Sequence, residues 1–371
     1  MKVSFDLRTE LGDTFRSNRV RSMYNVEPAV ASCVEIRADL PLEERDWSIG
    51  LVVGPSGSGK TSVGSRLGKL YAGEEWPADR PIIDAINPDG DMDDAAGALS
   101  AVGLGSVPSW LRPYRVLSGG ERFRADLARI LTDPGAGRGE PLVYDEFTSV
   151  VDRTAARIGA GAFGKAWRRT PGRRFVALAC HRDIEEWLLP DWVLDTEDWS
   201  FSWRSLRRPP PISVEIRRVP GRVWSLFENH HYLKVGILPG RNYVGLVDGK
   251  PVCHVVASTF VAGNLRLGRL VVMPEWQGAG VGLRFLEEVA LMWASGAERP
   301  PGRRWKLKSI AIHTSHPGLI AGLSRRKTWE RGRTVLCRDG SHQSRGIGAG
   351  HTLGAGHTRS VSAFYYVGGS A

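Results

Sequence analysis

The sequence predicts an α/β protein with two domains, a parallel α/β domain followed by a mixed α/β domain. Three observations lead to this prediction. The chain has 371 residues, more than a typical single domain holds. In its first half, short apolar runs alternate with helix-forming segments, as in parallel sheets covered by helices. In its second half, paired strands follow a proline-rich stretch, WRSLRRPPPISVEI at 203–216.

The first domain is expected to span residues 1–205. Its clearest strands are three short apolar runs that end in polar loops: SIGLVVG at 48–54, PLVYDEF at 141–147 and RRFVALAC at 173–180. Runs of this kind, without polar alternation, are typical of strands that are buried on both faces. The segment 206–212 contains three consecutive prolines, which cannot continue a helix or a central strand. We therefore expect it to be the linker.

The second domain is expected to span residues 213–371. Two strands joined by a tight Asp248–Gly249 turn are predicted within NYVGLVDGKPVCHVVASTFV at 242–261. The remaining expected elements are a strand in NLRLGRLVVMP, an amphipathic helix in GVGLRFLEEVALMWASG, a strand in LKSIAIHT and a closing strand in SAFYYVG.

Composition limits where this protein can act. No apolar stretch is long enough to cross a bilayer, and the start, MKVSFDLRTELGD, has no apolar core of a secretory signal. The four cysteines are Cys33, Cys180, Cys253 and Cys337, and none forms a pair with metal-ligand spacing. We therefore expect a cytoplasmic protein without a disulfide framework and without a membrane domain in this chain.

Positive charge is concentrated in the second half. From Pro209 to the end there are 22 Lys and Arg against nine Asp and Glu, which is +13, whereas residues 1–208 carry 28 against 31, which is −3. A basic half next to a near-neutral half indicates a polyanionic partner, and DNA is the partner we expect. The alternative is that the charge only keeps the surface soluble.

The segment GPSGSGKT at 54–61 matches the P-loop pattern and follows an apolar strand, as that pattern requires. Its glycines allow backbone N–H groups to surround phosphates, and the following helix adds positive potential. Lys60 is expected to reach the β- and γ-phosphates of ATP, and the Thr61 hydroxyl to bind Mg²⁺. The loop consists of Gly54, Pro55, Ser56, Gly57, Ser58, Gly59, Lys60 and Thr61.

Three more motifs accompany the P-loop. YDE at 144–146 ends a strand, where Asp145 can hold Mg²⁺ and Glu146 can polarise the attacking water. LSGGE at 117–121 precedes a predicted helix, and His181 ends the apolar run FVALACH. This set, in this order, resembles the ATP-binding cassette (ABC) ATPases over residues 45–200.

The resemblance implies functions for these motifs. Ser118, Gly119 and Gly120 would form the signature that caps the nucleotide bound to another subunit, so an ATP-dependent homodimer is expected. His181 would sense the γ-phosphate. No glutamine occurs between Thr61 and Leu117, where that family usually has one, and this points to the soluble ABC ATPases rather than the transporters.

A second glycine-rich loop occurs in VVMPEWQGAGVG at 271–282, between a strand and a helix. It contains no lysine, but the amides at a helix start can bind a pyrophosphate. The loop resembles motif A of the GCN5-related N-acetyltransferases (GNAT fold), which implies acetyl-CoA or another acyl-CoA as donor. Carried over, the donor-binding residues are Val272, Gln277, Gly278, Ala279, Gly280 and Gly282.

Candidate catalytic residues of the second domain lie on either side of this loop. WSLFENHHYLK brings His231 and Tyr232 together, and Ser315 and His316 follow a predicted strand. No tyrosine follows that strand as an acid for a leaving thiolate. Together with the closing aromatic strand, these motifs resemble the Mom family of phage DNA modification proteins, which have a GNAT-like fold. The resemblance implies modification of an adenine amine.

Three hypotheses therefore follow. The first is an ATP-hydrolysing protein fused to a transferase that modifies a base in DNA. The second is an acyl-CoA-dependent N-acyltransferase for a protein, tRNA or small amine, regulated by the ATPase half. The third is an ABC engine with an inactive GNAT-like adaptor. A histidine metal site is not supported by any ligand spacing.

Overall fold

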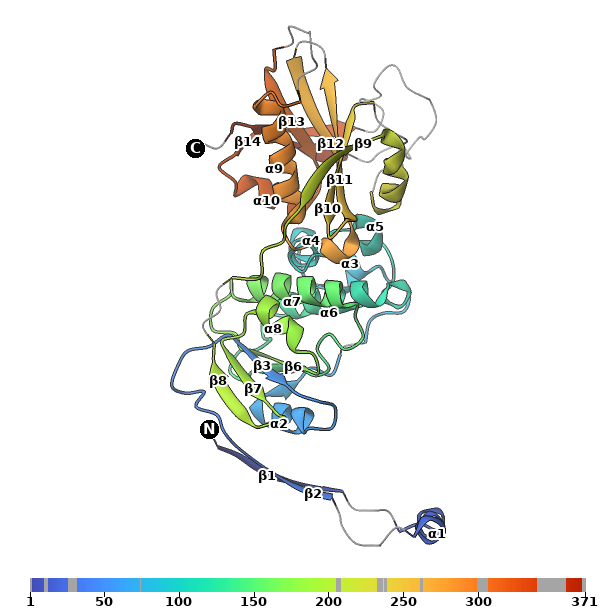
Figure 1. Cartoon of the computed structure of the whole chain (residues 1–371), viewed down its shortest axis with the longest axis vertical. Helices are drawn as coiled ribbons and strands as arrows, with labels where there is room; N and C mark the ends of the chain where they lie inside the picture. The colour runs from blue at the N-terminus through green and yellow to red at the C-terminus, as the bar shows by residue number, and fades with distance from the viewer. Residues whose placement is uncertain are drawn as a thin grey trace.

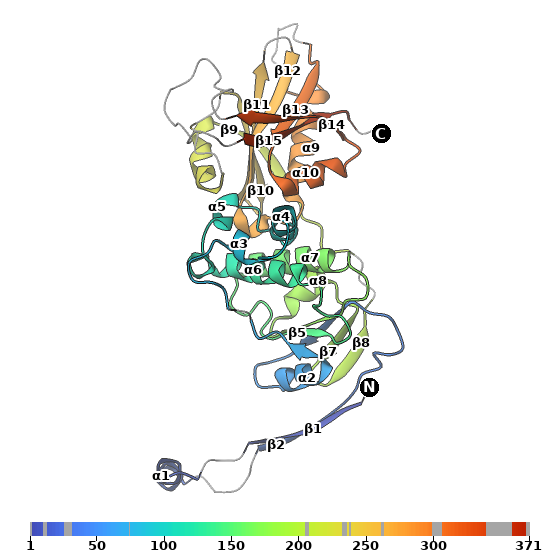
Figure 2. The same ribbon diagram turned by 180° about the vertical axis from the view of Figure 1, so that it is seen from behind.

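The computed structural model describes residues 2–9, 13–25, 32–73, 75–204, 208–231, 236, 239–260, 263–298, 306–338 and 358–368. One part of the described molecule contains a six-stranded sheet and the other a seven-stranded sheet. Helices α4, α6 and α7 lie between the two sheets (Figures 1 and 2). We call the two parts the first and second domains.

The first domain is built on a mainly parallel sheet, as the sequence predicted. The strand order is β4-β5-β6-β3-β7-β8, and only β8 runs antiparallel to its neighbour. The strands are β3 (Ile49–Val53), β4 (Lys69–Leu70), β5 (Leu142–Tyr144), β6 (Phe175–Ala179), β7 (Trp192–Asp195) and β8 (Ser200–Trp203). Because parallel strands end at one edge, the loops after β3, β5, β6 and β7 meet there.

Helices cover this sheet. They are α2 (Lys60–Leu67), α3 (Ile82–Ala85), α4 (Met92–Ala101), α5 (Val107–Trp110), α6 (Gly119–Thr132), α7 (Arg153–Trp167) and α8 (Glu185–Leu188), with short 3₁₀ turns η1 (Tyr114–Val116) and η2 (Arg182–Ile184). The buried side of α7 is rich in alanine and glycine. A Cβ at Gly159 would lie 3.0 Å from Phe123 of α6, so small residues let the two helices pack closely.

An N-terminal arm precedes this domain. It consists of β1 (Lys2–Thr9), helix α1 (Phe15–Tyr24) and β2 (Ser32–Asp39), and the two strands form their own antiparallel sheet. In both views the arm extends away from the two large sheets (Figures 1 and 2). No residue of α1 is buried. This separate sheet was not predicted from the sequence, in which residues 1–205 were taken as one domain.

The second domain has the sheet order β14-β15-β13-β12-β11-β10-β9. Its strands are β9 (Glu215–Val219), β10 (Arg241–Val247), β11 (Lys250–Phe260), β12 (Asn264–Val272), β13 (Ser309–Thr314), β14 (Trp329–Arg338) and β15 (Thr358–Tyr366). Asp248 and Gly249 both have positive φ and join β10 to β11, which confirms the predicted hairpin.

Strands β12 and β13 form the one parallel pair that the described part of this sheet contains, and they separate part-way along. Asn264–Leu267 pairs with Ser309–Ile312, whereas Gly268–Val272 has a strand partner only on the β11 side. Helix α9 (Val281–Ala294) begins beyond the end of β12, and α10 (Pro317–Ser324) follows β13. The domain also contains the 3₁₀ turns η3 (Gly221–Leu226), η4 (Glu228–His230) and η6 (Pro274–Trp276).

Apolar residues of α9 hold that helix on the sheet. Phe285, Leu286, Val289 and Trp293 are almost completely buried among side chains of β10 to β13. Each such side chain contributes about 1.5 to 3 kcal/mol of burial free energy. The start of α9 is therefore fixed next to the point where β12 and β13 separate.

Candidate functional sites

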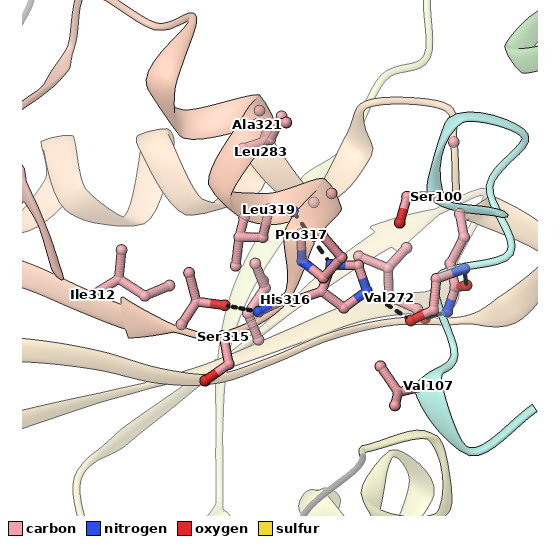
Figure 3. Close-up of a pocket in the computed structure, with 18 of the residues that line it drawn as sticks. Ser100, Val107, Val272, Leu283, Ile312, Ser315, His316, Pro317, Leu319 and Ala321 are labelled. Carbon is pink, nitrogen blue, oxygen red and sulfur yellow. Dashed lines mark hydrogen bonds between the residues drawn. The ribbon is translucent and has the colours of Figure 1, made fainter. Parts of the chain in front are cut away.

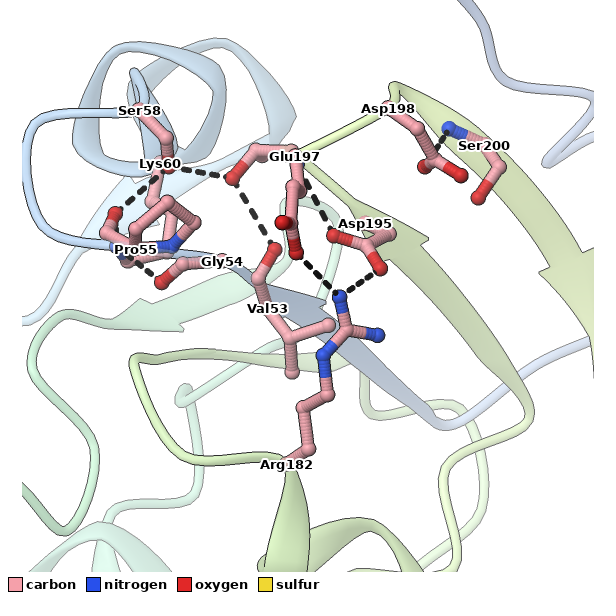
Figure 4. Close-up of polar contacts among 11 residues, drawn as sticks. Val53, Gly54, Pro55, Ser58, Lys60, Arg182, Asp195, Glu197, Asp198 and Ser200 are labelled. Carbon is pink, nitrogen blue, oxygen red and sulfur yellow. Dashed lines mark hydrogen bonds and ion pairs between the residues drawn. The ribbon is translucent and has the colours of Figure 1, made fainter.

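The P-loop lies between the end of β3 and the start of α2, as predicted. The buried Lys60 folds back over the loop, and its Nζ donates to the carbonyl oxygens of Gly54 at 2.8 Å and Pro55 at 2.5 Å (Figure 4). Gly57 and Gly59 have φ of 78° and 87°, a conformation that favours glycine. Gly59 gives α2 no side-chain cap, so the first N–H groups of the helix can bind an anion.

Thr61 and Asp145 form a pair that fits Mg²⁺. The Thr61 hydroxyl donates to Asp145 Oδ2 at 2.7 Å, although 84 residues separate them in sequence. Mg²⁺ in nucleotide sites is held by one or two protein oxygens together with phosphates and water. Asp145 and Thr61 supply such oxygens beside the P-loop, so the residues present fit the ion. In the described part of the chain, no cluster of three or more His, Cys, Asp and Glu side chains suits a metal.

Glu146 has an unusual backbone at the edge of the sheet. Its φ is 50°, and its N–H donates to Asp145 Oδ1 at 2.8 Å. A non-glycine residue in this region costs about 1 to 3 kcal/mol and is typical of functional sites. The Glu146 side chain is exposed, and so is His181 after the neighbouring strand β6. The fold therefore places both residues at the edge that carries the P-loop.

Two features of this edge were not found from the sequence. Thr196, directly after β7, donates to Val53 O at 3.1 Å, and its hydroxyl lies 2.5 Å from that of Ser58. A Cβ at Gly54 would lie 2.0 Å from Thr196 Oγ1, so this position requires glycine. Arg182 forms ion pairs with Asp195 and Glu197 (Figure 4). The polar DTED run at 195–198 was the available signal.

The LSGGE segment forms the start of α6. Ser118 is its N-cap, and Ser118 and Glu121 make a capping box. Burial alone would raise the pKa of Glu121, but hydrogen bonds from Ser109 and Ser118 outweigh it and lower the pKa. Ser118 and Gly119 are exposed, with Gly120 partly so. The motif is therefore a rigid, solvent-facing helix start.

The second glycine loop (residues 274–282) also leads into a helix that has no side-chain N-cap. Gly278 and Gly280 have φ of 94° and 78°, and Gly280 gives α9 no side-chain cap. A Cβ at Gly282 would lie 2.6 Å from Val272, so the helix packs tightly on β12 there. Together with the separated strands, the free N–H groups of this helix start fit a diphosphate and an extended arm.

A cavity of about 2180 Å³ runs along this loop, into the opening between β12 and β13, and between the two domains. Val272, Gln277, Gly278, Gly280 and Gly282, five of the six predicted donor-binding residues, line it. Ala279 is partly buried beside the core of the second domain. Within the described residues, one continuous hollow thus extends from the predicted donor loop to His231, Ser315 and His316.

His231 and Ser315 both line this cavity. His231 is buried, and its ring lies 5.7 Å from that of Trp224 in an edge-on contact. The Ser315 hydroxyl is buried and has no hydrogen-bond partner among the described residues. Tyr232 lies outside the residues that the structure describes. His231 and Ser315, which are 84 positions apart in sequence, thus line the same cavity.

His316 has a different environment. Figure 3 shows its ring directed toward the first domain, while the neighbouring Ser315 side chain points away from it. Nδ1 accepts from the Leu319 N–H at 3.3 Å, and Nε2 lies 2.8 Å from Gly105 O. Burial lowers its pKa, so the ring is neutral and donates through Nε2. Both ring nitrogens take part in hydrogen bonds. In this arrangement neither nitrogen can act as the base that removes a proton from an acceptor substrate.

Positive charge lines the sheet side of the cavity, where Arg266, Arg269 and Arg333 lie with Tyr365. Arg269 has a φ of 55° where the register of β11 and β12 shifts, a bulge that redirects side chains. Beneath it, His254 is fully buried, and burial lowers its pKa to about 4. His254 Nδ1 lies 3.4 Å from Arg269 O and Nε2 lies 3.0 Å from Asn242 Oδ1, so the ring connects the bulge to β10; no sequence pattern marked this residue.

The solved structures that resemble parts of this chain include ATP-binding cassettes and an acetyltransferase. One neighbour is an ATP-binding cassette that was solved as a dimer in a post-hydrolysis state bound to ADP and phosphate. It is 12% identical, the match covers 53% of this chain and 94% of the neighbour's chain, and the TM-score is 0.35. A dimeric bacterial ABC transporter cassette gives the same values. An IAA acetyltransferase from Bacillus cereus is 16% identical, covers 42% of this chain and 99% of its own, and has a TM-score of 0.30.

Other comparisons find nothing. No protein-family model matches the chain, and no curated protein does. Within the described ranges, no helix has the length and apolar character that crossing a membrane requires.

Proposed function

We propose that this chain is an ABC-type ATPase fused to a GNAT-type transferase that modifies an amine of a base in DNA. The observation that carries the proposal is the presence of two phosphate cradles of different design in one chain. The P-loop has a lysine and a Thr61–Asp145 pair, which suits a nucleotide with Mg²⁺. The second glycine loop has only backbone amides, which suits the diphosphate of a coenzyme A donor.

In the first domain, Lys60 and the P-loop amides would bind the phosphates, and Thr61 and Asp145 would hold Mg²⁺. Glu146 would orient and polarise the attacking water, and His181 would contact the γ-phosphate. The exposed Ser118–Gly120 segment would cap the nucleotide of a second copy. A Glu146→Gln variant, which slows hydrolysis, should therefore dimerise on addition of ATP in sedimentation velocity, and a monomer at saturating ATP would contradict this.

In the second domain, a coenzyme A thioester would supply the acyl group and the thiol leaving group. His231 would accept the proton that the acceptor amine gives up as its C–N bond to the acyl carbon forms. The Ser315 hydroxyl would donate to the sulfur as the C–S bond breaks. An aromatic amine is a weak nucleophile, so a base held beside it raises the rate.

DNA is the acceptor that charge favours. The +13 of residues 209–371 suits a polyanion, and Arg266, Arg269 and Arg333 line the cavity. A base must leave the duplex stack to enter such a cavity, and arginine and aromatic side chains hold flipped bases. The phosphate backbone would then follow the basic surface around the opening.

The test is mass spectrometry of nucleosides from DNA of cells that express the protein, with Lys60→Ala and His231→Ala as variants. A new modified adenine that disappears in both variants would support the proposal. Unmodified DNA from a folded, ATP-hydrolysing protein that acylates small amines would favour the alternative, an acyl-CoA N-acyltransferase for protein, tRNA or small amines. DNA binding without any covalent product would indicate an adaptor.

A further inference from the structure

The first domain holds the second glycine loop from outside. Gly105 N–H donates to Gln277 Oε1 at 2.8 Å, and Gln277 Nε2 donates to Val272 O at 2.9 Å. The Gln277 side chain is thus fixed between the first domain and the end of β12. It is a link between domains rather than a free donor-binding group.

Main chains of the two domains also touch directly. A Cβ at Gly103 would lie 2.2 Å from Gln277 O, and one at Gly278 would lie 3.0 Å from Gly103 Cα. Both glycines have positive φ, 82° and 94°. Two such segments, 175 positions apart, leave no room for a side chain between them, so movement of either one displaces the other.

Arg124 is the strongest of these links. Only 2% of its surface is exposed. It belongs to α6, and its guanidinium donates to Gly103 O at 3.0 Å, to Glu275 O at 3.1 Å and to Pro274 O. A buried charge is costly unless it is hydrogen-bonded, and the carbonyl oxygens of the loop supply those bonds. Burial lowers its pKa to about 10, so the group stays charged at neutral pH.

The position of Arg124 on α6 connects both predicted sites. The helix begins at Gly119, in the LSGGE segment, and Arg124 follows within two turns. The helix is one continuous element of 14 residues, and a capping box fixes its first turn. A displacement of the LSGGE end would therefore move Arg124 against the carbonyl groups of residues 274 and 275, at the entrance of the second glycine loop.

We propose that Arg124 is a positioning residue for the donor site, and that α6 transmits the nucleotide state of the first domain to the second glycine loop. This inference rests on the proposed function, because it takes the loop to be the donor site. It adds that the affinity for the donor depends on ATP, and by linkage that the donor changes the affinity for ATP by the same factor.

The test measures binding of coenzyme A by calorimetry, with and without saturating ATP, to full-length protein carrying Glu146→Gln so that ATP persists. In this background we expect ATP to change the Kd for coenzyme A about fivefold or more, the lower end of typical couplings. Adding Arg124→Lys should reduce the effect to less than about twofold and weaken coenzyme A binding itself, because the loop is less well ordered.

Arg168→Lys is the control. Arg168 is partly buried, and it donates to the carbonyl oxygens of Leu188 and Leu189, which belong to the first domain and lie outside α6 and the second glycine loop. Its replacement also removes arginine hydrogen bonds to carbonyl groups but should leave the coupling intact. If Arg124→Lys does not fold, Gln277→Leu removes the Gly105 contact and leaves the first domain unchanged; it should also weaken the coupling.

The outcomes separate the two proposals. If coenzyme A binds equally well with and without ATP, the coupling is wrong and the proposed donor site stands. If coenzyme A does not bind at all, the proposed donor site is wrong. In that case hydrogen exchange of the amides at 274–283 still tests the link: a change on ATP binding that is absent in Arg124→Lys supports it, and an unchanged exchange rate overturns it.

Discussion

Replacing Gly278 with alanine should destabilise the protein more than replacing Gly280, although both lie in the second glycine loop. Both have left-handed backbones, so alanine costs about 1 to 2 kcal/mol at either position. At Gly280 the new Cβ meets no heavy atom within 4 Å, whereas at Gly278 it would lie 3.0 Å from Ala162 Cβ and Gly103 Cα. Such crowding adds about 1 kcal/mol or more.

Urea unfolding, followed by tryptophan fluorescence, measures the difference between the two variants. Ala162 and Gly103 belong to the first domain, so the extra cost should appear together with faster hydrogen exchange at residues 103–105. Gly280→Ala is the control for backbone strain alone. Equal free energies of unfolding for the two variants, with unchanged exchange at 103–105, would refute the close contact between the domains.

Three further predictions concern single side chains. Lys60→Ala should abolish ATP hydrolysis while circular dichroism stays unchanged, and remaining ATPase activity would exclude the P-loop as its site. Ser315→Ala should leave stability unchanged or raise it slightly, because it removes an unsatisfied buried hydroxyl. The same variant should slow acyl transfer about tenfold or more, and equal transfer rates would exclude Ser315 from the reaction. Burial lowers the pKa of His254 to about 4, whereas a histidine in the unfolded chain has a pKa of about 6.5. Between these pH values the unfolded state binds more protons than the folded state. The free energy of unfolding should therefore fall by about 3 kcal/mol as the pH is lowered from about 6.5 to about 4. Denaturation at several pH values checks this, and His254→Gln should lack that component of the pH dependence.

The two glycine loops could be predicted from the sequence because their geometry is local. Gly57, Gly59, Gly278 and Gly280 have positive φ, a backbone conformation that glycine adopts without strain. The apolar run before the first loop forms the buried strand β3, the run before the second forms the partly buried strand β12, and a helix follows each loop as predicted. Periodicity and backbone freedom are properties of a few neighbouring residues, and a single sequence displays them directly.

The residues that contact these motifs in the folded protein could be predicted only in part. Asp145 was assigned to Mg²⁺ from its motif, whereas Thr196 was missed because a single threonine after a strand carries no pattern. His316 was expected at the catalytic centre, but its ring contacts Gly105 of the first domain. Nothing near His316 in the sequence indicates a residue 211 positions away. The N-terminal arm was missed because its strands pair only with each other.

The sequence by itself determined that this chain has two glycine loops, a parallel sheet for one and a mixed sheet for the other, with a proline-rich segment between them. Only the tertiary structure decided that Arg124 holds one loop from the helix that begins in the LSGGE segment. Its hydrogen bonds go to carbonyl groups, which every residue has, so no side-chain pattern marks the partner. Contacts of this kind depend on how two folded surfaces meet, and that is settled by packing across the whole molecule.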